Sequence, residues 1–105
     1  MAQIPIEIKD KIDKYLDSLK KNQIPITEAV LFGSYARGTQ KEWSDIDIAL
    51  VSTIFKGNRI EDKDKIRHIT LSVSSEIEVI PFSLKDFNQK NPLAREIIET
   101  GIRLL

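Results

Sequence analysis

The feature that most constrains this chain is a Gly-Ser pair that ends one apolar run and precedes, by ten residues, two aspartates that open another. The first run is Val30-Leu31-Phe32, followed by Gly33-Ser34, and the second lies within Asp45-Ile46-Asp47-Ile48. Successive side chains of a β-strand point to opposite faces, so residues two apart share a face. The pattern predicts two short strands, the first ending in a tight turn and the second carrying Asp45 and Asp47 on one face.

The residue types in this pattern indicate phosphate and metal chemistry. Gly33 has no side chain, so a phosphate can approach the backbone, and the Ser34 hydroxyl and nearby amides can hold its oxygens. Asp45 and Asp47 are disfavoured in a strand and place like charges side by side, which a divalent cation offsets. Gly-Ser alone is also typical of a strand-ending turn, and the aspartates alone of a solvent-facing strand. Their combination favours the phosphate and metal interpretation.

Hydrophobic spacing and end signals predict the remaining elements. We expect helices over 5–21, 60–75 and 93–100, a helical turn over 34–38, and strands over 28–32, 45–52 and 76–81. Ser83-Leu84-Lys85-Asp86 has the form of a helix cap with a carboxylate three residues on. The tail Ile102-Arg103-Leu104-Leu105 is expected to close the core, with a partner surface as the alternative. We expect a single domain spanning 1–105.

Composition excludes several classes of partner and site. Sixteen basic residues balance sixteen acidic ones, so no net field attracts nucleic acid or an anionic membrane, and we expect neither as a direct partner. The absence of cysteine excludes disulfides and thiolate metal sites, and the single histidine argues against His-rich zinc chemistry. No window approaches the ~20 apolar residues that span a bilayer. A cytoplasmic location is expected.

The residues of the first motif carry a family resemblance. The run Leu-Phe-Gly-Ser-Tyr-Ala-Arg-Gly, followed by Ser-Asp-Ile-Asp-Ile-Ala-Leu-Val, resembles the minimal nucleotidyltransferase (MNT) family of the polymerase-beta-like nucleotidyltransferase superfamily. The likeness runs from the first helix to Gly101. It implies an α+β fold, with a small mixed sheet of three to four strands and helices packed on one face. It also implies an enzyme that uses Mg²⁺, as two ions, to move AMP from ATP to a hydroxyl.

The resemblance also implies roles for individual residues. Gly33 and Ser34 are expected to hold the outer phosphates of the nucleotide, and Asp45 and Asp47 to bind magnesium. The third carboxylate of the family lies in the next strand, where Glu78 stands between apolar residues.

Several further residues leave alternatives open. Glu76 shares a face with Glu78 and competes with it for the role of third carboxylate. Arg37, on the same turn as Ser34, is expected to reach a phosphate, with a surface salt bridge as the alternative. Tyr35 and Trp43 are expected to pack the loop rather than stack on a base, and we assign no role to the charge run over 61–67.

A partner follows from the same resemblance. A stand-alone MNT protein of this size resembles the antitoxin of toxin–antitoxin pairs whose other half is an all-helical HEPN ribonuclease. The resemblance implies that the protein adenylylates a tyrosine of that toxin. One alternative is an antitoxin that neutralises the toxin by binding alone, and another is a nucleotidyltransferase for small molecules.

Overall fold

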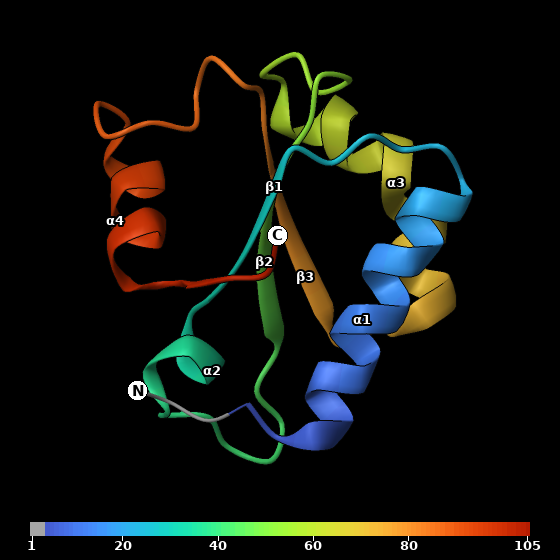
Figure 1. Cartoon of the computed structure of the whole chain (residues 1–105), viewed down its shortest axis with the longest axis vertical. Helices are drawn as coiled ribbons and strands as arrows, with labels where there is room; N and C mark the ends of the chain where they lie inside the picture. Colours follow the sequence, from blue (N-terminus) through green and yellow to red (C-terminus); the bar gives the residue numbers. More distant parts are fainter. Residues whose placement is uncertain (1–3) are drawn as a thin grey trace.

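A four-stranded mixed sheet, with strand order β3-β2-β1-β4, forms the centre of the structure (Figure 1). The computed structural model describes residues 4–105. β1 pairs antiparallel with β2 and with β4, whereas β2 and β3 are parallel. In chain order the elements are α1 Ile6–Lys21, β1 Glu28–Phe32, α2 Ser34–Arg37, β2 Ile46–Val51, α3 Arg59–Val73, β3 Ile77–Phe82, α4 Pro92–Thr100 and β4 Ile102–Arg103.

The elements expected from the sequence are confirmed, each to within two residues at either end. Pro5 is the N-cap residue immediately before α1, where its fixed φ suits the entry to the helix and its missing N–H leaves no bond unmade. The Asn91 side chain caps α4 by accepting from the backbone N–H groups of Leu93 and Ala94. The α+β class and the mixed sheet are confirmed as well. No helix of residues 4–105 is both long enough and apolar enough to cross a membrane.

Helices cover both faces of the sheet because β2 is apolar on both faces. Ile46, Ile48 and Leu50 point into a core shared with α1 and α3, and Ala49 and Val51 point into a second core shared with α4. The expectation of helices on one face thus describes α1 and α3. α4 lies across the opposite face, as Figure 1 shows. This second layer faces the side of β2 that carries Asp47.

A buried hydroxyl pair joins α1 to α3. Tyr15 Oη lies 2.7 Å from Thr70 Oγ1, and the Thr70 hydroxyl lies 3.0 Å from the carbonyl of Ile66. A carbonyl can only accept, so Thr70 donates to Ile66 and accepts from Tyr15. Burial raises the pKa of Tyr15 to about 12, against a smaller lowering by its bond to Thr70. Tyr15 is therefore a neutral donor at neutral pH.

We expect Tyr15→Phe to lower the free energy of unfolding by about 1 kcal/mol, because Thr70 loses its donor while the ring remains packed. Urea unfolding of Tyr15→Phe, Thr70→Val and the double variant forms the appropriate cycle. A double variant whose loss equals the sum of the two single losses would show that the pair contributes nothing.

Two predictions around α4 need correction or refinement. Ser83 and Asp86 do bond as in a helix cap, but no helix follows them, and residues 83–91 form turns. The side chains of Asn88 and Asn91 donate to nearby backbone carbonyls, which competes with helix formation. The tail packs Ile102 and Leu104 against the α1/α3 core and adds the short strand β4, whereas residue 105 is exposed.

Pro81 lies in β3, an edge strand, without weakening the sheet. The carbonyl of Glu76 accepts from the N–H of Ile46, and that of Phe82 accepts from the N–H of Ser52. The backbone N–H and C=O groups of the even-numbered residues in this segment therefore point toward β2. The backbone of Pro81 therefore faces away from β2. Its missing N–H removes no bond of the sheet, as expected of proline in an edge strand.

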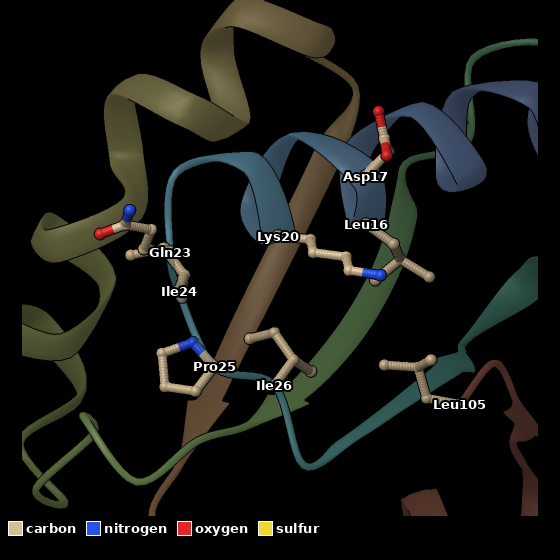
Figure 2. A pocket seen from close by; sticks show the side chains of 8 residues that line it. All are labelled: Leu16, Asp17, Lys20, Gln23, Ile24, Pro25, Ile26 and Leu105. Atoms are coloured by element: carbon tan, nitrogen blue, oxygen red, sulfur yellow. The ribbon is translucent and has the colours of Figure 1, made fainter.

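A hollow of about 630 Å³ lies at the C-terminal end of α1 (Figure 2). Its wall and floor are largely apolar, and none of the residues predicted to carry chemistry lines it. The lining residues are Leu16, Asp17, Lys20, Gln23, Ile24, Pro25, Ile26 and Leu105.

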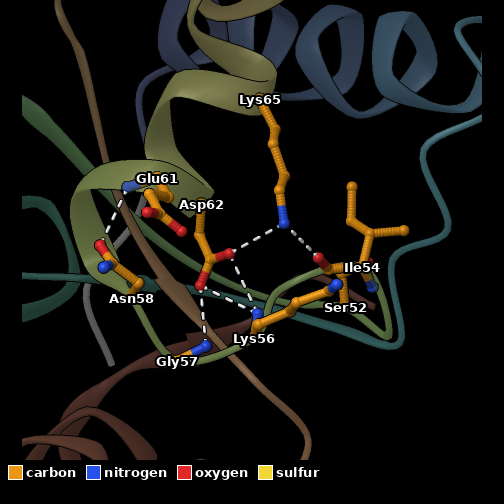
Figure 3. A network of polar contacts seen from close by, with 8 residues as sticks. All are labelled: Ser52, Ile54, Lys56, Gly57, Asn58, Glu61, Asp62 and Lys65. Atoms are coloured by element: carbon orange, nitrogen blue, oxygen red, sulfur yellow. Dashed lines mark hydrogen bonds and ion pairs between the residues drawn. The ribbon is translucent and has the colours of Figure 1, made fainter.

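A buried carboxylate ties the loop after β2 to the first turn of α3 (Figure 3). Asp62 is fully buried and accepts hydrogen bonds from the backbone N–H groups of Lys56, at 3.0 Å, and Gly57, at 2.9 Å. Lys65 Nζ lies 3.2 Å from Asp62 and also donates to the carbonyl of Ile54. Our assignment of no role to the charge run is wrong for Asp62.

Candidate active site

Gly33 forms the turn between β1 and α2. Its backbone has φ 75° and ψ −150°, a conformation that essentially glycine alone adopts. The preceding residue, Phe32, pairs with Asp47 across the antiparallel strands. A Cβ on Gly33 would overlap the Asp47 carboxylate, so the bare backbone of this turn lies directly against that side chain. Gly38, in the left-handed conformation, ends α2.

The parallel pairing of β2 and β3 brings two predicted carboxylates together. Asp47 and Glu78 are register partners, so their side chains leave the same face of the sheet. Asp45 lies one residue before β2 and is exposed, whereas Asp47 is half-buried. The structure thus places Asp45, Asp47 and Glu78 at one end of the β2–β3 pair, beside the Gly33 turn.

The electrostatics of Asp47 reflect this crowding. Burial raises its pKa, the negative charges of Asp45 and Glu78 raise it further, and the positive charge of Arg37 lowers it. Concentrated negative charge of this kind is relieved by a bound cation. Carboxylate oxygens are also the hard ligands that Mg²⁺ prefers. The donor chemistry therefore fits magnesium.

The two candidate third carboxylates have different partners. Glu78 Oε1 lies 2.6 Å from Lys63 Nζ of α3, and Glu76 Oε1 lies 3.2 Å from Lys11 Nζ of α1. Only Glu78 is paired in register with Asp47. Within residues 4–105 no three His, Asp or Glu side chains are arranged to hold a metal ion together. Ligands from the substrate would therefore have to complete a metal shell that begins with Asp45 and Asp47.

The Gly33 turn and Asp47 open into a pocket of about 240 Å³ whose far wall is α4. Its lining residues are Phe32, Gly33, Arg37, Asp47, Leu93, Glu96, Ile97 and Thr100. Sequence reasoning did not predict the four α4 residues, because their position depends on how that helix packs across the sheet. The signal that could have found two of them is the four-residue spacing of Glu96 and Thr100, which puts both polar side chains on one face of the helix.

The remaining predicted residues, in α2 and the loop that follows it, differ in their exposure to solvent. Tyr35 is buried in the α1/α3 core, as expected. Trp43 is 78% exposed, so the expectation that it packs the loop is wrong. Ser34 begins α2, and Arg37 forms no ion pair within the described part of the chain. The salt-bridge alternative for Arg37 is therefore not seen, and Arg37 lines the pocket with Asp47.

The sequence matches a family model described as "Nucleotidyltransferase domain" over residues 12–105. The chain belongs to this family. A Methanocaldococcus jannaschii relative named protein adenylyltransferase MJ1305 is 32% identical to this nucleotidyltransferase domain over 101 residues, which cover 90% of the chain and 68% of the relative. Another, from the same organism and named protein adenylyltransferase MJ1215, is 52% identical over 42 residues. That match covers 40% of the chain and about half of the relative, 48%.

The nucleotidyltransferase domain is also similar in structure to toxin–antitoxin proteins. A toxin–antitoxin crystallised with AMP-PNP matches with a TM-score of 0.59 and 30% identity, covering 89% of this chain and 71% of that one. A MntA–HpeT toxin–antitoxin variant matches with a TM-score of 0.61 and 26% identity, covering 90% and 71%. A nucleotidyltransferase structure from Sulfolobus solfataricus, with a TM-score of 0.57, 19% identity and coverage of 98% and 89%, shows the shared fold.

Proposed function

We propose that this nucleotidyltransferase domain transfers AMP from ATP, with Mg²⁺, to a tyrosine hydroxyl of a HEPN-domain ribonuclease and thereby acts as its antitoxin. The proposal rests on one observation: the Gly33 turn, which has no side chain, lies against Asp47, and Asp45 and Glu78 lie near Asp47. A phosphate-accessible backbone next to clustered carboxylates is the arrangement that metal-assisted nucleotidyl transfer requires.

Each predicted site residue has a role in this proposal. Gly33, Ser34 and Arg37 bind the outer phosphates, and Asp45 and Asp47 hold magnesium. Glu78 completes the site for a second ion by leaving Lys63. Bound Mg²⁺ supplies charge neutralisation on the triphosphate and lowers the pKa of the acceptor hydroxyl.

The transfer itself is an in-line displacement. The acceptor oxygen bonds to the α-phosphorus of ATP, the bond from that phosphorus to the bridging oxygen breaks, pyrophosphate leaves, and the hydroxyl proton is released. The Gly33 turn, Ser34 and Arg37 hold the leaving group in line while the acceptor approaches from the opposite side.

A protein acceptor is supported by the relatives and by the loop before β2. Two of the structural neighbours are toxin–antitoxin proteins, one of them with AMP-PNP, and both curated relatives are named as protein adenylyltransferases. Trp43, two residues before Asp45, is 78% exposed, and exposed tryptophans are frequent anchors of protein interfaces. A ribonuclease partner and ATP as donor both place the reaction in the cytoplasm.

The test begins with a search of the neighbouring genes for one that encodes a HEPN-domain protein, and continues with a mass spectrum of that protein after incubation with this protein, ATP and Mg²⁺. We expect the partner to gain the mass of one or more AMP units, and fragmentation to locate them on tyrosine. The gain should be absent without Mg²⁺. An unmodified partner that does not bind this protein would overturn the proposal.

Antitoxin action by binding alone is the second candidate, and the Lys63–Glu78 ion pair favours it. In that pair Glu78, the candidate third carboxylate, is already bound to Lys63. The described residues also contain no preassembled metal site with three ligands. The same experiment separates the two candidates. A tight complex whose partner gains no mass would establish neutralisation by contact.

We expect Gly33→Ala to weaken ATP binding at least about tenfold and to destabilise the fold by about 1–3 kcal/mol. The stability loss arises from a backbone conformation closed to alanine, and the binding loss from displacement of the Asp47 carboxylate by the new methyl group. Calorimetric ATP titration and thermal unfolding measure the two effects. Gly57→Ala, at another positive-φ glycine remote from the site, is the control and should lose stability while keeping ATP affinity.

A further inference from the structure

The wall that α4 contributes to the site pocket carries a carboxylate and a hydroxyl group. Asp47, Gly33 and Arg37 line one side of the pocket, and Glu96 and Thr100 of α4 line the other. Phe32, Leu93 and Ile97 supply the apolar part of the lining. A ligand that fills this pocket therefore meets Arg37 and the Asp47 carboxylate on the sheet side, the Glu96 carboxylate on the α4 side, and apolar side chains from both.

This order of groups matches one part of a nucleotide. Phosphate oxygens suit Arg37 and the Gly33 turn, and an apolar ring face suits Phe32 and Leu93. Hydroxyl groups suit a carboxylate, because an ionised carboxylate is a strong acceptor with no donor of its own. The negative charge of Glu96 disfavours a phosphate on the α4 side, so a nucleotide would place its sugar there.

The Glu96 carboxylate is free to accept such a bond. Its neighbours on the helix, Arg95 and Glu99, form an ion pair with each other at 3.1 Å. The Thr100 hydroxyl donates to the backbone carbonyl of Glu96, at 2.7 Å, and leaves the carboxylate unused. Glu96 itself has no ion-pair partner among residues 4–105.

We propose that Glu96 accepts a hydrogen bond from a ribose hydroxyl of the bound nucleotide and so selects ribonucleotides over deoxyribonucleotides. The inference rests on the proposed function, since it assigns a part of the same nucleotide site. Glu96 is exposed in the free protein, but a nucleotide that fills the pocket covers its carboxylate, and a deoxy analogue then leaves that charge without a donor.

The experiment is calorimetric titration of the protein with ATP, 2′-deoxyATP and 3′-deoxyATP in the presence of Mg²⁺. We expect the wild type to bind one of the two analogues about 10- to 100-fold more weakly than ATP, the range for a hydrogen bond to a charged group. Glu96→Ala should bind ATP and that analogue equally. Glu96→Gln, which keeps one acceptor oxygen, should retain part of the discrimination.

Glu99→Ala is the matched control, because Glu99 lies on the same helix, is ion-paired and does not line the site pocket. It should keep the wild-type discrimination. Equal binding of all three nucleotides by the wild type, or unchanged discrimination in Glu96→Ala, would overturn this inference and leave the proposed function standing. Absence of binding by every nucleotide would overturn both.

Discussion

Asp47→Asn is expected to slow AMP transfer strongly while leaving the protein folded. Asp47 is the carboxylate on which the site converges, since the Gly33 backbone lies against it and Glu78 pairs with it in register. A metal ion contributes several kcal/mol of charge stabilisation, so loss of one carboxylate ligand should slow transfer on the order of 10³-fold. The rate of AMP incorporation into the partner, at saturating ATP and Mg²⁺, measures the effect.

The same variant should not lose stability. Burial and two neighbouring negative charges raise the pKa of Asp47, which means that its ionised form is disfavoured in the cation-free fold. A neutral asparagine removes that repulsion, so we expect its melting temperature to equal or exceed that of the wild type. Asp13→Asn, on the exposed face of α1, is the control for charge loss and should transfer AMP normally. Undiminished AMP transfer by Asp47→Asn would show that Asp47 has no role in the reaction.

Asp62→Asn is expected to cause the largest loss of stability among conservative changes of charged residues. The amide presents one oxygen where the carboxylate presents two, and it leaves the N–H groups of Lys56 and Gly57 and the Lys65 ammonium incompletely paired. Breaking a buried charge network of this kind should lower the free energy of unfolding by about 2–3 kcal/mol. In a domain of this length that corresponds to roughly 10–20 °C in melting temperature.

The pH dependence gives an independent check on Asp62. Burial acts to raise its pKa, but the bonds from Lys56, Gly57 and Lys65 outweigh burial and hold the pKa below the ordinary value. A carboxyl with a lowered pKa stabilises the fold above the pKa of the unfolded chain and loses that contribution as the pH falls through the folded pKa. The difference in unfolding free energy between wild type and Asp62→Asn should therefore be full at pH 7 and shrink below about pH 4.

Glu61→Gln provides the control for Asp62, since its side chain is exposed one residue away on the same helical turn. Its unfolding free energy should stay within about 0.5 kcal/mol of the wild type at neutral pH. Equal effects of the two substitutions would show that the bonds to Asp62 do not stabilise the loop.

Local pattern was sufficient to predict most of this fold. The alternation in β2 and the helical spacing of α1 are properties of neighbouring residues, and caps such as Pro5 and Gly38 act within one turn. The candidate site was predictable for the same reason, because the Gly33 turn and the two aspartates are brought together by one hairpin-like pair of strands.

What the sequence did not predict depends on contacts between distant elements. Asp62 lies among other charges in the chain, and its burial follows from the loop that folds over α3. Glu96 belongs to a helix whose place across the sheet is set by apolar contacts on the far face of β2. Trp43 was expected to pack but is exposed, and nothing in the local sequence distinguishes a packed from an exposed tryptophan here.

The proline in β3 has a consequence for how copies of this protein meet in solution. The outer side of β3 carries the backbone groups of odd-numbered residues, and at Pro81 that side offers no donor. A strand from another molecule that aligned with β3 could bond to Ile77 and Val79 but would find the ladder interrupted at the next outward position. The sheet edge that carries Glu78 is thereby protected against intermolecular sheet growth and aggregation.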